Sequence, residues 1–205
     1  MSMNTKNAKL TLDDIADLRA YERDRADFRR HIIDLKRGRR VAVGPIVTLL
    51  FENRDTIRFQ IQEMARAEKM LSDEAIETEL GVYNPLIPSA GELSATLFIE
   101  LTSKEELIEW LPKLVGIETA LELRIGDDPN EVIVVKNAVD PEHEKQLTRE
   151  EITASVHYVR WSLSPEQVER FAAGPVTLAI AHPTYAEEVE LSPDTRESLL
   201  DDLRG

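Results

Sequence analysis

Four histidines carry most of the chemistry that this sequence could perform, because the chain of 205 residues contains no cysteine. His157 and His182 each fall at alternate spacing with apolar residues in a β-branched run. Alternate residues of a strand share one face, so each imidazole should continue an apolar stripe towards the end of a strand. If the two strands are neighbours, these side chains meet near one end of a sheet. His31 and His143 are expected at the surface.

Neutral imidazole together with carboxylate is the ligand set of an iron, manganese or zinc site without thiolates. With His157 and His182, Glu63 is the carboxylate that we expect to complete such a site. Four further carboxylates could take its place: Glu68, Glu100, Glu187 and Glu190. However, the sequence contains no HxxxH, HxH or ExxH spacing. A histidine that ends an apolar strand is more often a hydrogen-bonded structural residue, so the metal site is the second of two hypotheses.

Other catalytic signatures are absent from the sequence. The lack of cysteine excludes disulfides, thiolate zinc sites, thiolate iron–sulfur ligation and cysteine nucleophiles. No phosphate-binding glycine loop, GxSxG nucleophile motif or HExxH zinc motif occurs. One polar set remains, and it is either solvated surface or a ligand-facing patch: Gln60, Gln62, Glu63 and Arg66.

The charge of the chain is unevenly distributed. The net charge is −14, yet residues 1–40 carry 11 Lys or Arg against 7 Asp or Glu. An acidic body argues against nucleic-acid binding, which needs cations to neutralise phosphates. The basic run at residues 36–40 suits the C-terminus of a helix. The N-terminus lacks an apolar signal region and no run is long enough to span a membrane, so we expect a cytoplasmic protein without membrane contact.

A long helix is predicted over residues 12–36, opened by Thr11 with Asp14 and closed by Gly38. One face follows alternate spacings of three and four, which is typical of a helix seam: Leu18, Tyr21, Arg25, Phe28, Ile32 and Leu35. This seam predicts either a dimer or partner helix, or an arm folded onto its own sheet with Arg25 paired to an acidic residue. We favour the second interpretation.

Residues 41–70 are predicted to organise the rest of the chain. The β-branched run at 41–51, the polar residues 52–55 and the alternation at 57–61 indicate a hairpin, followed by a helix from Gln62. In this interpretation Gly44 and Pro45 mark a bulge or an edge. The alternative is a strand followed directly by a helix, because apolar residues from Ile57 onwards also fit a helical face.

The remaining chain shows a recurring order of elements. A helix at 72–81 and a loop at 83–88 precede two sets of strand, helix, strand, strand. The first set covers 93–101, 104–111, 120–125 and 132–135, and the second covers 155–163, 165–171, 176–181 and 185–191. An acidic connector with a capping box at Thr148 and Glu151 separates them, and a helix capped by Ser192 ends the chain.

These elements predict an α+β protein with a mainly antiparallel sheet. The two sets form a βαββ pseudo-repeat, and the long N-terminal helix packs across the sheet. We expect a single compact domain over residues 1–205. Within it, residues 1–82 supply the N-terminal helix, the hairpin and further helices, and residues 92–205 supply the two βαββ-like halves and the C-terminal helix.

Several segments resemble the bacterial family known as domain of unknown function 3501. They are TLDDIADLRAYERDRADFRR, VGPIVTLLFENRDTIRFQIQEM, VTLAIAHPTY and ESLLDDL, with FENRDT and QIQEM the most specific. The resemblance implies a single-domain cytoplasmic protein without an assigned activity, encoded near genes for rubrerythrin-like and iron–sulfur oxidoreductase proteins. The order of strands and helices is also similar to glyoxalase-like folds, which hold a metal between paired modules, although symmetric ligands are missing here.

Two function hypotheses follow. The leading hypothesis is a non-enzymatic accessory or interaction protein, without a cofactor, whose acidic body and basic helix engage a protein partner or a second copy in a homodimer. The partner would be a redox or iron-related enzyme. The alternative is a small His/carboxylate metal-binding protein or metalloenzyme that uses iron, manganese or zinc.

Overall fold

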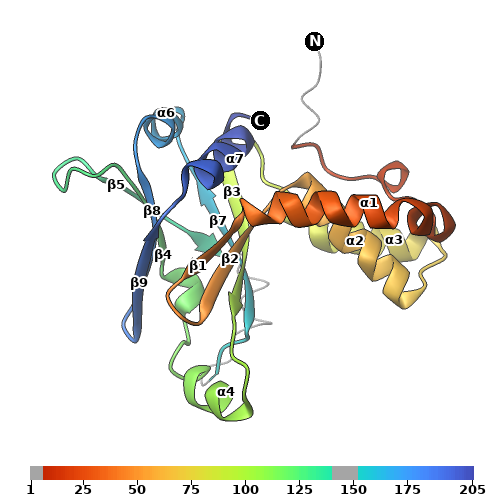
Figure 1. The fold of residues 1–205 in the computed structure, drawn as a ribbon, viewed down its shortest axis with the longest axis horizontal. Helices are drawn as coiled ribbons and strands as arrows, with labels where there is room; N and C mark the ends of the chain where they lie inside the picture. The colour runs from red at the N-terminus through yellow and green to blue at the C-terminus, as the bar shows by residue number, and fades with distance from the viewer. Residues whose placement is uncertain (1–6, 140–151) are drawn as a thin grey trace.

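The computed structural model describes residues 7–139 and 152–205. Two antiparallel sheets pack face to face, and a helical lobe lies beside one of them (Figure 1). Sheet A has the strand order β1-β2-β3-β7-β6 and sheet B the order β5-β4-β8-β9. The strands are β1 (Arg40–Val43), β2 (Val47–Glu52), β3 (Glu92–Ile99), β4 (Leu121–Ile125), β5 (Ile133–Lys136), β6 (Ala138–Val139), β7 (Val156–Ser162), β8 (Val176–His182) and β9 (Tyr185–Glu190).

The predicted α+β class with antiparallel strands is confirmed. The helices are α1 (Leu18–Arg37), α2 (Arg54–Glu68), α3 (Asp73–Tyr83), α4 (Lys104–Trp110), α6 (Pro165–Ala173) and α7 (Pro193–Arg204), with short 3-10 turns η1 (Leu12–Asp14), η2 (Asn84–Leu86) and η3 (Ile117–Thr119). None of the helices in the described part of the chain is long and apolar enough to cross a membrane.

The main hydrophobic core lies between the two sheets. Every second residue of β3, including Leu93 and Leu97, belongs to this core, together with Trp161 of β7 and Leu178 of β8. A second, smaller core lies inside the helical lobe, which we define as residues 7–37 and 54–87; its buried members are Leu10, Ile57, Ile61, Leu80 and Ile87. Sheet A is therefore covered on one face by sheet B and on much of the other by the lobe.

The hairpin predicted with its turn at residues 52–55 is wrong. The real hairpin joins β1 and β2, with Val43 opposite Val47, so Gly44 and Pro45 form its turn instead of a bulge. Residues 54–68 form one helix, as the alternative interpretation held. Asn53 caps this helix, because its side chain accepts a hydrogen bond from the Thr56 amide. This cap and the i, i+4 spacing of apolar residues outweigh the short alternation that suggested a strand.

The long N-terminal helix is shorter than predicted, since η1 and a break precede it. α1 begins after Asp17, whose side chain accepts hydrogen bonds from the amides of Arg19 and Ala20, and it ends before Gly38. Its main packing partner is α2 within the lobe, so it does not lie across the sheet as expected. The predicted pairing of Arg25 with an acidic residue is confirmed, because its guanidinium binds both carboxylate oxygens of Glu63 at 2.8 Å.

The second half of the chain follows the predicted order of elements. The serine caps at Ser103, Ser164 and Ser192 all accept hydrogen bonds from the first turns of their helices. β3 and β7 pair in sheet A, while the hairpins β4–β5 and β8–β9 share sheet B. The first two strands of the halves thus lie beside their counterparts, β3 beside β7 and β4 beside β8, whereas β5 and β9 form opposite edges of sheet B. The pseudo-repeat itself stays a prediction. The connector with His143 and the Thr148 capping box lies outside the described residues.

The proposed division at residues 82–92 does not separate two sheets. β2, from the first part, pairs along its whole length with β3, from the second. Both parts therefore build sheet A together, and the single-domain organisation stays a prediction that is compatible with this shared sheet.

Candidate functional site

A row of buried polar side chains lies on the outer face of sheet A, opposite the hydrophobic core. Its members are Thr48 and Glu52 on β2 and Ser94 and Thr96 on β3. Because their neighbours in sequence point into the core, strand alternation directs these four side chains towards the helical lobe. Buried polar groups need hydrogen-bond partners, so a row of them on one face of the sheet is a candidate binding site.

The carboxylate of Glu52 is the centre of this row. Only 7% of Glu52 is exposed. The hydroxyl of Thr96 donates a hydrogen bond to Oε1 at 2.7 Å, and the hydroxyl of Thr56, one turn into α2, donates one to Oε2. Among residues 7–139 and 152–205, the carboxylate forms no ion pair. The Glu52 carboxylate is therefore buried, and two neutral hydroxyls fix its orientation.

A cavity of about 190 Å³ opens beside Glu52, between sheet A and the lobe. We call it the outer cleft. Its lining combines one acid and one base with amide, hydroxyl, aromatic and aliphatic groups: Lys36, Leu50, Glu52, Thr56, Ile57, Gln60, Tyr83, Leu86, Thr96, Phe98, Val156 and Tyr158. A second cavity of about 230 Å³ shares Leu86 and Tyr158 with it and reaches Arg160 and β6. Mixed apolar walls with a few convergent polar groups are typical of small-molecule sites.

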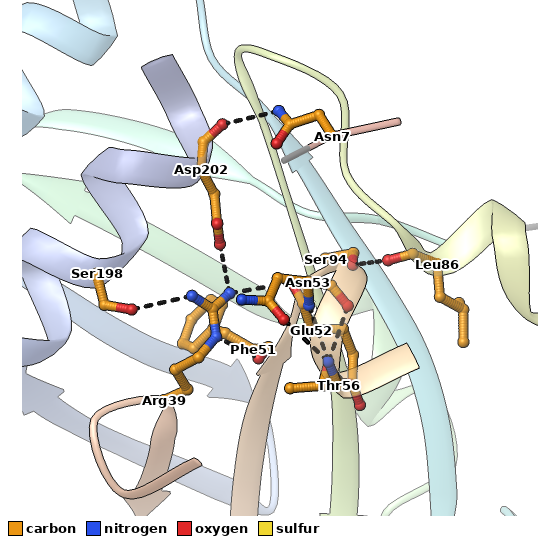
Figure 2. A network of polar contacts seen from close by, with 10 residues as sticks. All are labelled: Asn7, Arg39, Phe51, Glu52, Asn53, Thr56, Leu86, Ser94, Ser198 and Asp202. Atoms are coloured by element: carbon orange, nitrogen blue, oxygen red, sulfur yellow. Dashed lines mark hydrogen bonds and ion pairs between the residues drawn. The ribbon is translucent and has the colours of Figure 1, made fainter. Parts of the chain in front are cut away.

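Figure 2 shows how Arg39 and its partners hold the end of β2. Arg39, only 1% exposed, donates from Nε to the Phe51 carbonyl at 2.9 Å and from Nη2 to the Glu52 carbonyl at 3.0 Å. The same guanidinium donates to the Ser198 hydroxyl at 3.0 Å and forms an ion pair with Asp202, both on α7. Glu52 is thereby fixed twice, through its backbone by Arg39 and through its carboxylate by the threonines.

The 3-10 turn η2, which contributes Leu86 to the cleft lining, is also hydrogen-bonded to sheet A. The hydroxyl of Ser94 donates to the Leu86 carbonyl in η2 (Figure 2). Tyr158, on the adjacent strand, has a raised pKa because it is buried and because Tyr83 and Glu52 lie near it. Its phenol is therefore protonated at neutral pH and can serve as a hydrogen-bond donor or acceptor in the cleft.

The structure places the three predicted metal ligands on three different elements, β7, β8 and α2. His157 lies on β7 in sheet A, where Nε2 is 2.8 Å from the Thr153 hydroxyl and 2.9 Å from the Ala154 carbonyl. His182 lies on β8 in sheet B, with Nε2 3.0 Å from the Val115 carbonyl. Both histidines are thus buried strand residues with hydrogen-bond partners in the protein.

Glu63, the third predicted ligand, belongs to the lobe. Hydrogen bonds from Arg25 and then from Tyr21 lower the pKa of Glu63 to about 2, and the Tyr21 hydroxyl lies 2.6 Å from Oε1. In the described ranges, no group of three or more histidine or acidic side chains is arranged to hold a metal ion. The iron, manganese or zinc site therefore stays a prediction.

The comparisons with known proteins identify the family. Residues 9–203 match the family described as "Protein of unknown function (DUF3501)". The chain belongs to the DUF3501 family. A solved structure of a novel protein of unknown function from Burkholderia pseudomallei K96243 is 34% identical, with a TM-score of 0.86, and the match covers 96% of this chain and 100% of that one. No curated protein matches.

In this DUF3501 chain, the segment FENRDT supplies the centre of the site. The sequence pattern predicted a turn at Glu52 and so did not mark it as a site residue, although Asn53 and Thr56 carry the signature of a helix N-terminus. The basic run likewise predicted only the C-terminus of a helix around Arg39. Nothing local marks Arg39 as buried, because its ion-pair partner Asp202 lies 163 residues away.

The polar set at residues 60–66 divides among different roles in the DUF3501 chain. Gln60 lines the outer cleft, whereas Gln62 is buried and exchanges two hydrogen bonds with the backbone of Ala16. Glu63 binds Arg25, and Arg66 forms an ion pair with Glu22 of α1. Only Gln60 fits the ligand-facing interpretation.

One prediction concerns the pH dependence of stability. Burial lowers the pKa of His157, against the opposing influence of the Glu118 charge and the Ala154 carbonyl. Below about pH 6.5 the unfolded chain binds a proton that the folded chain does not, so the free energy of unfolding falls as the pH falls. The loss approaches about 1.4 kcal/mol per pH unit until the pKa of the folded state is reached. Above about pH 6.5 the contribution is fully present.

The test is urea denaturation between about pH 5 and pH 8. His157→Gln should remove this part of the slope, whereas His31→Gln should keep it, because the His31 side chain is 60% exposed. Equal slopes in the two variants would contradict the assignment to His157.

Proposed function

We propose that this protein is a non-catalytic accessory protein that binds a small organic molecule in the outer cleft. The observation that carries the proposal is the buried carboxylate of Glu52, which faces a cavity and is held by two hydroxyls. A buried charge without a counter-charge is costly, so proteins keep such groups where a partner compensates them. A ligand with a complementary group would supply that partner.

The position of the cleft supports a regulatory use of the ligand. Its walls come from β2, β3 and β7 of sheet A and from α1, α2, α3 and η2 of the lobe. A bound molecule would contact both parts at once and would strengthen their association, because ligands stabilise the state that binds them. The lobe also carries α1, whose exposed residues could let a protein partner or a second copy sense the change. A redox or iron-dependent enzyme is the partner that the family resemblance favours.

A ligand screen tests the proposal. The protein is mixed with a library of small metabolites, and binding is detected by ligand-observed NMR. Gln60→Trp places a large side chain at the cleft, where Gln60 is exposed, and should abolish binding of true ligands. Ala67→Trp, on the exposed part of α2 two turns further along, is the matched control and should bind normally.

The outcomes are distinct. A compound that binds the native protein and Ala67→Trp but not Gln60→Trp supports the proposal. If no compound of any chemical class distinguishes Gln60→Trp from the other two proteins, the outer cleft is not a ligand site and the proposed function is wrong.

A further inference from the structure

We propose that the ligand of the outer cleft is a small amino-carboxylate whose protonated amine binds the Glu52 carboxylate and whose carboxylate lies near Lys36. This inference rests on the proposed function and adds the chemical class of the ligand. It follows from the number of open acceptor positions on Glu52, the aromatic walls beside it and the lysine in the cleft lining.

The first step concerns the hydrogen-bonding capacity of Glu52. An ionised carboxylate offers about four acceptor positions. Thr96 and Thr56 occupy one position on each oxygen. Both hydroxyls are donors to Glu52, so they fix its orientation without neutralising its charge. A group that brings donors and a positive charge together is the complement of this arrangement, and a protonated amine has three donors and one charge.

The second step concerns the walls of the cleft. Three aromatic side chains, Tyr83, Phe98 and Tyr158, line the same cavity as Glu52. The face of an aromatic ring attracts a cation, and sites that combine such faces with a carboxylate are suited to ammonium groups. Tyr158 and Thr96 occupy paired positions on β7 and β3, so the ring and the hydroxyl beside Glu52 share one face of the sheet. The apolar members of the lining suit a short aliphatic chain.

The third step concerns Lys36, the only cation among the described residues that line the 190 Å³ cavity. Its ammonium group lies 5.5 Å from the centre of the Phe59 ring on α2. A second positive charge on the ligand would be repelled there, whereas a carboxylate would be attracted. The cleft therefore discriminates between ligands by the charge at the end remote from the amine: a zwitterion fits and a diamine does not.

Four probes with the same number of carbon atoms test this inference. They are γ-aminobutyrate, n-butylamine, n-butyrate and putrescine, each titrated into the isotope-labelled protein and followed by NMR at millimolar concentration. We expect γ-aminobutyrate to bind most tightly, n-butylamine to bind more weakly, and n-butyrate to bind least. Chemical-shift changes should concentrate at the residues around Glu52 and Tyr158.

Two variants assign the charges. Glu52→Gln keeps the shape and should weaken binding of γ-aminobutyrate and n-butylamine by about tenfold or more, because a charge-assisted contact is lost. Lys36→Met should weaken γ-aminobutyrate and strengthen putrescine, a change of opposite sign that a loss of folding cannot produce. Lys36 is partly exposed, so this variant tests the inference even if Glu52→Gln fails to fold. Glu190→Gln, an exposed acid on β9, is the control and should bind all four probes as the native protein does.

The inference is overturned if n-butyrate binds as tightly as the amines, if Lys36→Met changes γ-aminobutyrate and putrescine alike, or if none of the four probes binds. In each of these cases the amino-carboxylate inference is wrong, and the metabolite screen with Gln60→Trp still tests whether the outer cleft binds any ligand. A neutral or anionic compound that loses binding in Gln60→Trp would keep the outer cleft as a ligand site while removing the amino-carboxylate.

Discussion

Replacing Arg39 with methionine is expected to lower the free energy of unfolding by about 3–5 kcal/mol, the usual cost of breaking a buried ion pair by removing one partner. The guanidinium donates to two β2 carbonyls and to Ser198, and it pairs with Asp202. Methionine fills similar space but leaves the carbonyls and the buried acid without these donors. Urea denaturation with a folding probe in the near-ultraviolet measures the loss.

The adjacent residue provides the control. Arg40 also forms an ion pair, with Glu100, but its side chain is 47% exposed. Exposed pairs contribute up to about 1 kcal/mol, so Arg40→Met should have a small effect. Adding Asp202→Leu to Arg39→Met should recover part of the loss, because both buried charges are then gone. Similar losses for Arg39→Met and Arg40→Met would show that the network does not stabilise the fold.

Gly44→Ala is expected to lower the free energy of unfolding by about 2–4 kcal/mol, from a left-handed backbone and from overpacking. Gly44 has φ +71° in the β1–β2 turn. A Cβ there would overlap the Tyr185 hydroxyl and lie 2.6 Å from Cγ of Glu187. That hydroxyl donates to the Val43 carbonyl at 2.7 Å, so its displacement would also loosen the contact between the edges of the two sheets.

The control for this substitution is Gly38→Ala. Gly38 has φ −80°, and no described residue outside its immediate chain neighbours comes within 4 Å of the position that an added Cβ would take, so alanine fits without strain. Its effect should be within about 0.5 kcal/mol of the native protein or slightly stabilising. Chemical denaturation midpoints compare the two variants. If they coincide, the close approach of Tyr185 and Glu187 to the turn does not restrict Gly44.

The elements of the second half could be predicted because their signals are local. Ser103, Ser164 and Ser192 each accept a hydrogen bond from an amide within three residues, and a cap of this kind depends on no distant part of the chain. The same signal at Asn53 marks the start of α2. However, the alternation around Phe59 favoured a strand, although Phe59 packs against Phe28 of α1 with ring centres 5.7 Å apart.

The candidate site could not be predicted in the same way. Glu52 becomes buried only because the lobe covers the outer face of sheet A, and an acid at the end of a strand gives no sign of that cover. The seam on α1 was recognised, but its pattern fits α2, a sheet or a second subunit equally well. Three-dimensional contacts such as that between Arg25 and Glu63 identify α2 as the partner.

The passage from β2 into α2 has a mechanical consequence. A single residue, Asn53, lies between the last residue of the strand and the first of the helix, and its side chain is already engaged as the cap. No flexible loop separates the strand from the helix, so a displacement of the end of β2 must rotate the axis of α2. Because α2 is 15 residues long, a small rotation at Asn53 becomes a larger movement at its far end. A shift of β2 at Glu52 would therefore be amplified along α2.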